Sequence, residues 1–131
     1  MSSERDGAGR RRVLIVDRSA DTREVLRTAL ERRGLQIFEA PGPQQGLEVA
    51  RRCQPDLIVL DLEATSPAEA SVLDGYSAQL RHHRSELLLL GGAGRPPALA
   101  RGQHVTAPYH YAPLVRKIEQ LLDGALTADA A

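Results

Sequence analysis

The sequence has little cysteine, no net charge and no long apolar run. Cys53 is the one cysteine of the chain, which excludes an intramolecular disulfide and a cysteine cluster for zinc. The 17 Lys and Arg side chains balance 17 Asp and Glu side chains. This balance argues against nucleic-acid binding, because such chains normally carry a clustered basic excess. No segment reaches the roughly 20 apolar residues of a membrane span, and the polar start lacks an apolar signal region. We therefore expect a cytoplasmic chain without membrane contact.

The length of 131 residues predicts one domain, whose core needs neither a disulfide nor a metal. Residues 1–10 are rich in Ser, Gly and charge and predict a disordered arm. Residues 11–124 are expected to form the folded domain, and residues 125–131 a flexible tail.

Two short apolar runs each end in an aspartate. Val13 to Val16 precede Asp17, and Leu57 to Leu60 precede Asp61. An unbroken apolar run without helical spacing suits a strand buried on both faces, as in a parallel sheet. In open parallel sheets, ligands bind beyond the carboxyl ends of the strands, where the strand order reverses. The pattern therefore predicts that Asp17 and Asp61 lie close together at one site.

The rest of the chain alternates between strand and helix patterns. Further strands are predicted at 35–38, 87–90 and 103–106, and helices after Asp21, from Pro43, at 75–84 and at 111–123. Asp21 is the predicted helix cap, with Glu24 three residues later, and Gly34 and Gly124 are predicted to end the first and last helices. Residues 63–73 show no periodicity and predict a loop with at most one helical turn. Alternating elements favour an α/β fold with a five-stranded, parallel, doubly wound sheet of flavodoxin-like order 2-1-3-4-5.

From Arg12 to Asp123 the chain resembles the receiver domain of bacterial two-component response regulators, the CheY-like family. The resemblance rests on Val13 to Asp17, on Pro55 to Leu62, on Asp74-Gly75, and on Pro108 before an amphipathic helix. It implies that Asp61 holds the position that accepts a phosphoryl group from a histidine kinase. It also implies a magnesium-binding acidic pair after strand one, a Thr or Ser after strand four and a Lys after strand five.

The chain departs from the family pattern at three of these five positions. The acidic pair is Asp17-Arg18, the Thr or Ser position is Gly91, and the Lys position is Ala107. The aromatic switch position of the family falls near His104. The stretch from Gly91 to Ala107 is short, which predicts a shortened fourth helix.

These losses predict a degenerate receiver, or pseudo-receiver. Magnesium usually takes one or two carboxylates, and Arg18 replaces a ligand with a positive charge. Phosphoryl transfer depends on positioning and charge neutralisation, which the missing Lys and hydroxyl would have supplied. We expect no cofactor and no metal; the weak candidate ligands for Mg²⁺ are Asp17, Asp61 and Glu63.

Three functions remain open. The leading hypothesis is a non-enzymatic signalling domain that binds a protein, either a histidine kinase or a downstream signalling protein, without phosphorylation. A rival is a working receiver that is phosphorylated on Asp61. A third is a flavodoxin-like domain that binds a small ligand, suggested weakly by Gly91 to Gly94. The sequence leaves the oligomeric state open.

The direction of the Arg18 side chain also has two readings. In one, its guanidinium pairs with Asp61 or Asp17 and locks one conformation without phosphate, because a planar fork binds a carboxylate through two hydrogen bonds. In the other, Arg18 points to solvent.

Overall fold

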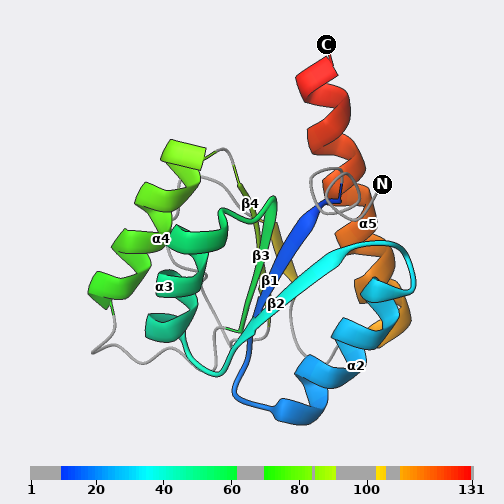
Figure 1. Cartoon of the computed structure of the whole chain (residues 1–131), viewed down its shortest axis with the longest axis horizontal. Coiled ribbons are helices and arrows are strands. Elements are labelled where there is room, and N and C mark those ends of the chain that lie inside the picture. The colour runs from blue at the N-terminus through cyan, green and yellow to red at the C-terminus, as the bar shows by residue number, and fades with distance from the viewer. Residues whose placement is uncertain (1–9, 62–69, 84, 91–102, 106–109, 131) are drawn as a thin grey trace, which may run out of the picture.

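The structure is a computed structural model, and it describes residues 10–61, 70–83, 85–90, 103–105 and 110–130; for 70–73, 103–105 and 124–130 it describes the backbone only. Five parallel strands form one sheet in the order β2-β1-β3-β4-β5, as predicted. The strands are β1 (Arg12–Val16), β2 (Gln36–Ala40), β3 (Leu57–Asp61), β4 (Glu86–Leu90) and β5 (Gln103–Val105). The helices are α2 (Ala20–Glu31), α3 (Pro43–Cys53), α4 (Ala70–His83) and α5 (Tyr111–Ala130). Figure 1 shows the central strands between two layers of helices.

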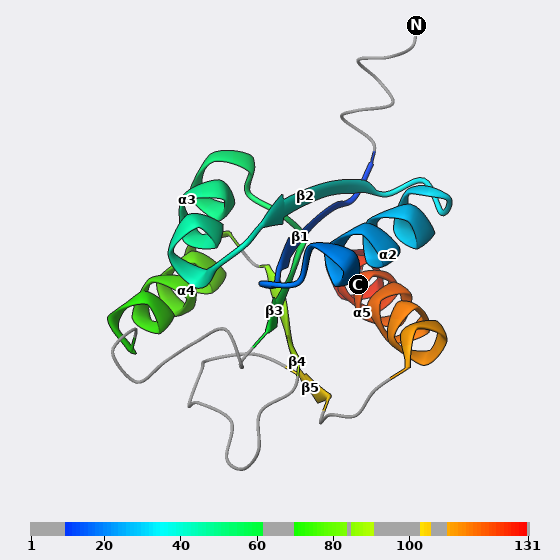
Figure 2. The same cartoon turned by 90° about the horizontal axis from the view of Figure 1, so that it is seen from below.

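Two apolar layers enclose the sheet. Figure 2 shows α3 and α4 on one face and α2 and α5 on the other. Alternate residues of β1 enter different layers, with Val13 and Ile15 facing α2 and α5, and Leu14 and Val16 facing α3 and α4. Both faces of β1, β3 and β4 are therefore buried, which explains why their sequences are continuously apolar.

The first helix ends in the way its sequence predicts. Gly34 adopts a left-handed φ of +82°. Its N–H donates to the Glu31 carbonyl at 3.0 Å, and the Leu35 N–H donates to the Leu30 carbonyl at 3.3 Å. These two bonds form a Schellman motif, in which glycine avoids the steric cost of positive φ.

Three predicted boundaries are wrong. The α2 cap is Ser19, whose Oγ accepts from the Thr22 N–H at 3.1 Å, so Asp21 lies inside the first turn. The helix expected from Gly75 begins at Ala70, because the intervening Ser, Val and Leu residues extend it without a breaker. The last helix continues through Gly124 to Ala130. Glycine costs only about 1 kcal/mol inside a helix, and the alanines and leucine that follow favour helix.

Candidate functional site

Asp17 and Asp61 belong to neighbouring strands at the carboxyl edge of the sheet. β1 and β3 pair in parallel with Val16 opposite Leu60, and each aspartate follows one of these residues. Asp61 is the last residue of β3 and is half-buried, while Asp17 is buried with 4% of its surface exposed. β1 lies where the strand order reverses, so the backbone positions of the two aspartates adjoin the expected site.

The Asp17 carboxylate is tied to its own loop. Its Oδ1 accepts a hydrogen bond from the Ser19 N–H at 2.8 Å. Ser19 in turn caps α2 through its hydroxyl, so one short turn both ends β1 and begins the helix. The carboxylate is thereby oriented by the backbone two residues later.

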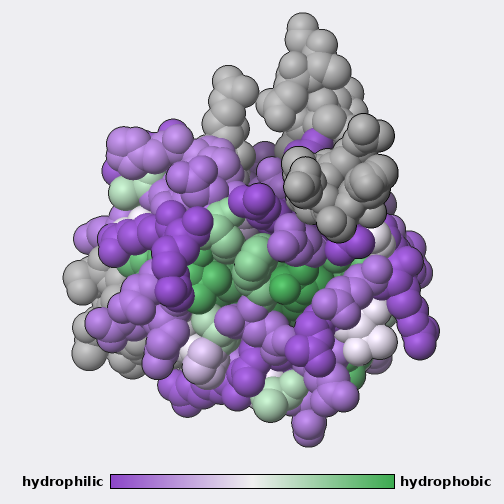
Figure 3. All heavy atoms as spheres, viewed as in Figure 1, coloured by the Kyte–Doolittle hydropathy of each residue, from purple (hydrophilic) through white to green (hydrophobic). Residues whose placement is uncertain are grey.

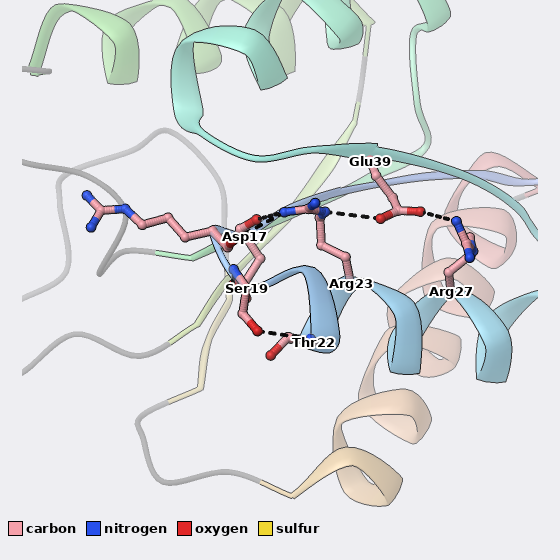
Figure 4. A network of polar contacts seen from close by, with 7 residues as sticks. Asp17, Ser19, Thr22, Arg23, Arg27 and Glu39 are labelled. Atoms are coloured by element: carbon pink, nitrogen blue, oxygen red, sulfur yellow. Dashed lines mark hydrogen bonds and ion pairs between the residues drawn. The ribbon is translucent and has the colours of Figure 1, made fainter.

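A second set of contacts, made by Arg23 and Arg27 of α2, holds this turn, and the sequence analysis did not predict it. The Arg23 Nη1 donates to the Asp17 carbonyl at 2.6 Å and to the Arg18 carbonyl at 3.4 Å. The Arg23 Nε donates to Glu39 Oε1 at 3.1 Å, and Arg27 Nη1 donates to Glu39 Oε2 at 2.6 Å. Figure 4 shows Arg23 between Asp17 and Glu39, and Glu39 between the two arginines.

The arginine network joins three successive elements: the end of β1, α2 and β2. Arg23 and Arg27 lie four residues apart on one side of α2. Glu39 lies near the carboxyl end of β2, on the strand beside β1. The i, i+4 spacing of the two arginines is visible in the sequence. Their shared partner, the Glu39 carboxylate, can be identified only once β2 is known to lie beside β1.

Arg18 is exposed, whereas Asp17 before it is buried. The guanidinium that holds the Asp17–Arg18 backbone is that of Arg23. The proposed pairing of Arg18 with Asp61 or Asp17 stays a prediction.

The remaining predicted site residues fall mostly outside the described part. The backbone of His104 lies in β5, opposite Leu89 of β4. Glu63, Gly91 and Ala107 lie outside the described residues, as does the predicted short fourth helix.

The described residues place two carboxylate-bearing residues, Asp17 and Asp61, at this edge, and the expectation that the chain binds no metal stays a prediction. Among the described residues, no three His, Cys, Asp or Glu side chains gather closely enough to hold a metal ion. Asp17 already accepts from Ser19, and the second position of the acidic pair carries the cation Arg18. Mg²⁺ prefers oxygen ligands in a nearly octahedral arrangement.

Two contacts, one near each end of α2, link that helix to α5. Thr22 Oγ1 and Tyr111 Oη lie 3.2 Å apart at the starts of α2 and α5. Arg33, just beyond α2, forms an ion pair with Glu119 of α5 at 3.1 Å. A shallow hollow follows α2 and is lined by Asp21, Glu24, Val25, Thr28, Ala29 and Arg32. The hollow contains neither aspartate of the candidate site.

Comparison with solved structures identifies the fold. The chain has the fold of CheY-like response-regulator receiver domains. A response-regulator receiver domain protein from Methanospirillum hungatei JF-1 superposes with a TM-score of 0.73 at 18% identity, covering 92% of this chain and 99% of that one. No family model matches the sequence.

Two curated proteins are similar in sequence over part of the chain. One is the KDP operon transcriptional regulatory protein KdpE of Escherichia coli K12, 52% identical over 50 residues, which is 38% of this chain and 22% of that protein. The other is protein-glutamate methylesterase/protein-glutamine glutaminase 1 of Anaeromyxobacter dehalogenans, 40% identical over 68 residues, 52% of this chain and 20% of that protein. The matches thus span about a fifth of each relative. Within the described residues, no helix has both the length and the apolarity that a membrane crossing requires.

Proposed function

We propose that this chain is a pseudo-receiver: a receiver-type signalling domain that acts by binding another protein and does not depend on phosphorylation. The observation that carries the proposal concerns Asp17 and Arg18, the two residues that follow β1. There a cation, Arg18, stands in place of the second acidic residue, and the carboxylate of Asp17 accepts from the Ser19 backbone. A receiver that uses Mg²⁺ needs carboxylate oxygens at this exit.

The chemistry of phosphoryl transfer supports the same conclusion. Protein groups catalyse it by positioning the phosphoryl group and neutralising its charge. The sequence has Ala107 where the family has Lys and Gly91 where it has a hydroxyl. Arg23, which bonds to the backbone of Asp17, uses its guanidinium on two backbone carbonyls and on Glu39. The Arg23 guanidinium is therefore already bonded to the Asp17–Arg18 loop and to Glu39.

The proposed partner is a histidine kinase or a downstream signalling protein in the cytoplasm. The two curated relatives carry different outputs in their names, a transcriptional regulator and a methylesterase. Because the similarity covers only about a fifth of each relative, it does not indicate which of these outputs this chain serves. We propose no catalytic activity, no nucleic-acid contact and no membrane contact for this domain.

The experiment that tests the proposal is phosphorylation by a small donor. Wild-type protein is incubated with radiolabelled acetyl phosphate over 0 to about 20 mM MgCl₂, beside Asp61→Asn and Arg18→Asp. We expect no stoichiometric label on the wild type at any magnesium concentration, and a gain of label for Arg18→Asp, because an acidic pair is restored.

The rival function, phosphorylation of Asp61, has one supporting observation: Asp61 ends β3 and is partly accessible. Magnesium-dependent label on the wild type that disappears in Asp61→Asn would establish this rival and reject phosphorylation independence. Label that persists in Asp61→Asn would instead mark another acceptor and leave the proposal standing.

A further inference from the structure

β2 is an edge strand: one of its two sides has no neighbouring strand in the described structure. β2 is the first strand of the sheet and pairs on one side with β1. Figure 2 shows its other side facing away from the sheet, between α2 and α3. Exposed strand edges present backbone donors and acceptors that can pair with another strand.

The hydrogen-bond ladder identifies which groups face outward. The Gln36 N–H donates to the Arg11 carbonyl at 2.9 Å, and the Ala40 carbonyl accepts from the Asp17 N–H at 3.1 Å. In a parallel ladder, alternate residues of a strand bond to the same neighbour. Gln36, Phe38 and Ala40 therefore face β1. The N–H and carbonyl groups of Ile37 and Glu39 face outward and bond to no described residue.

Apolar side chains accompany this edge. Leu35, Ile37 and Phe38 are only partly buried against the core layers, and Val49 of α3 is partly buried as well. Figure 3, in the view of Figure 1, shows an apolar strip across the middle of this face, with hydrophilic side chains on either side. Phe38 is the only phenylalanine of the chain, and it stands at the centre of β2.

The one charge on β2 is neutralised within the chain. A charged side chain on an edge strand usually discourages pairing. Here Glu39 forms ion pairs with Arg23 at 3.1 Å and with Arg27 at 2.6 Å, and its side chain is 24% exposed. Pairing at this edge would therefore not bring together two uncompensated carboxylates.

We propose that two copies of this chain associate through their β2 edges, antiparallel, about a twofold axis that passes midway between the two Phe38 residues. In this register Ile37 stands opposite Glu39 of the second copy, and Glu39 opposite its Ile37. Each such couple is a hydrogen-bonded pair that exchanges two N–H···O bonds. All the outward groups of both strands are then satisfied, because they lie on two positions placed symmetrically around Phe38.

A second copy fits this edge better than an arbitrary strand. The axis places Phe38 opposite Phe38 of the other copy in a non-hydrogen-bonded pair, where facing side chains approach most closely. The contact is isologous, so it closes at two copies and does not propagate into a filament. α2 and α3 both pack on β2, and the same axis brings each helix toward its counterpart, which adds buried area beyond the strands.

The first test is sedimentation velocity of the full chain from about 10 µM to about 1 mM. We expect a concentration-dependent shift from monomer to dimer, and its loss in Phe38→Lys, which puts two like charges opposite each other. Val25→Lys is the matched control, because Val25 is an exposed apolar residue (41%) that lines the hollow along α2. It lies two residues from Arg23 and so on the opposite side of the helix from the contact with β2, and the variant should dimerise like the wild type. Circular dichroism establishes that both variants are folded.

The second test remains decisive even if Phe38→Lys unfolds. In a Cys53→Ser background, the chain has no other cysteine. Cα atoms of a non-hydrogen-bonded antiparallel pair are about 4.5 Å apart, within the range for a disulfide. Phe38→Cys should therefore form an intermolecular disulfide under mild oxidation at least about tenfold faster than Val25→Cys.

Equal cross-linking of the two cysteine variants would overturn the proposal. So would a monomer throughout the concentration range. Both experiments are independent of whether Asp61 accepts phosphate, so failure here leaves the proposed function untouched.

Discussion

Arg23 and Arg27 share one carboxylate but are buried to different extents. The Arg23 side chain is 18% exposed and also bonds to the carbonyls of Asp17 and Arg18. Arg27 is 43% exposed, and its one partner among the described residues is Glu39. A charge-assisted bond to a partly buried backbone group contributes more than an exposed ion pair, which water and salt screen. The two arginines therefore form a matched pair for mutation.

We predict that Arg23→Ala lowers the free energy of unfolding by about 1–2 kcal/mol, and Arg27→Ala by less than about 1 kcal/mol. Arg23→Lys should recover little, because a single ammonium cannot reach both Glu39 and the Asp17 carbonyl in the way a guanidinium fork does. Urea denaturation measures all three. A larger loss for Arg27→Ala than for Arg23→Ala would show that the loop contacts of Arg23 carry no stability.

Cys53 gives the second prediction at this scale, which concerns pH. Burial raises the pKa of the Cys53 thiol, and the nearby Arg12 opposes this in part. Because the folded pKa lies above the unfolded one, the unfolded chain loses the thiol proton first, and stability falls as pH rises above about 8.5. Between pH 8 and 10, the wild type should lose more stability than Cys53→Ser. Parallel curves for the two proteins would contradict the raised pKa.

At the scale of elements, α3 and α4 approach each other through glycine. A Cβ on Gly46 would meet the Tyr76 hydroxyl, and would lie 2.6 Å from Val16 Cγ2. Tyr76 is fully buried and cannot move freely, because its hydroxyl donates to the Pro43 carbonyl at 2.6 Å. A Cβ on Gly75 would meet Leu47 Cδ2, the end of a flexible side chain.

Gly46→Ala is therefore expected to destabilise the fold by about 1–2 kcal/mol, since overpacking outweighs the gain of about 1 kcal/mol in helix propensity. Gly75→Ala should be close to neutral, because Leu47 can change rotamer. Thermal unfolding of the two variants tests the contrast. Equal stability of Gly46→Ala and wild type would mean that α3 can shift away from Tyr76 at little cost.

The elements that were predicted well from the sequence are those whose burial requires apolar residues throughout. β1, β3 and β4 are apolar throughout because helices cover both faces, and Pro43 marks the start of α3. The start of α4 and the end of α5 were missed, because local residues there fit either helix or loop. Ser19 and Asp21 are both acceptable caps, and only the path of the turn after β1 decides between them.

The same limit applies to the candidate site. The adjacency of Asp17 and Asp61 followed from strand order, since both aspartates come directly after apolar runs. The clamp of Arg23 on the Asp17 carbonyl did not follow, because it depends on side-chain geometry across three elements. The sequence therefore predicted which backbone positions meet, and missed the contacts that hold them there.

At the scale of the whole molecule, binding of an ion to the folded chain should raise its free energy of unfolding. A ligand that binds only the folded chain adds RT ln(1 + [L]/Kd), which is about 1.4 kcal/mol when the ligand is at ten times its Kd. Arg18 beside Asp17 is expected to keep magnesium affinity too weak for this gain.

We predict that about 10 mM MgCl₂ leaves the Tm of the wild type unchanged relative to NaCl of equal ionic strength. In Arg18→Asp the same addition should raise Tm by several degrees, because the restored carboxylate joins Asp17 and Asp61 at the strand ends. Arg18→Ala is the control that removes the positive charge without adding a ligand, and it should gain less than Arg18→Asp. Asp61→Asn in the Arg18→Asp background should abolish the gain if the ion sits between the two strand exits. An equal rise in Tm for wild type and Arg18→Asp would mean that the guanidinium does not exclude magnesium, and the central reason for classing this chain as a pseudo-receiver would fail.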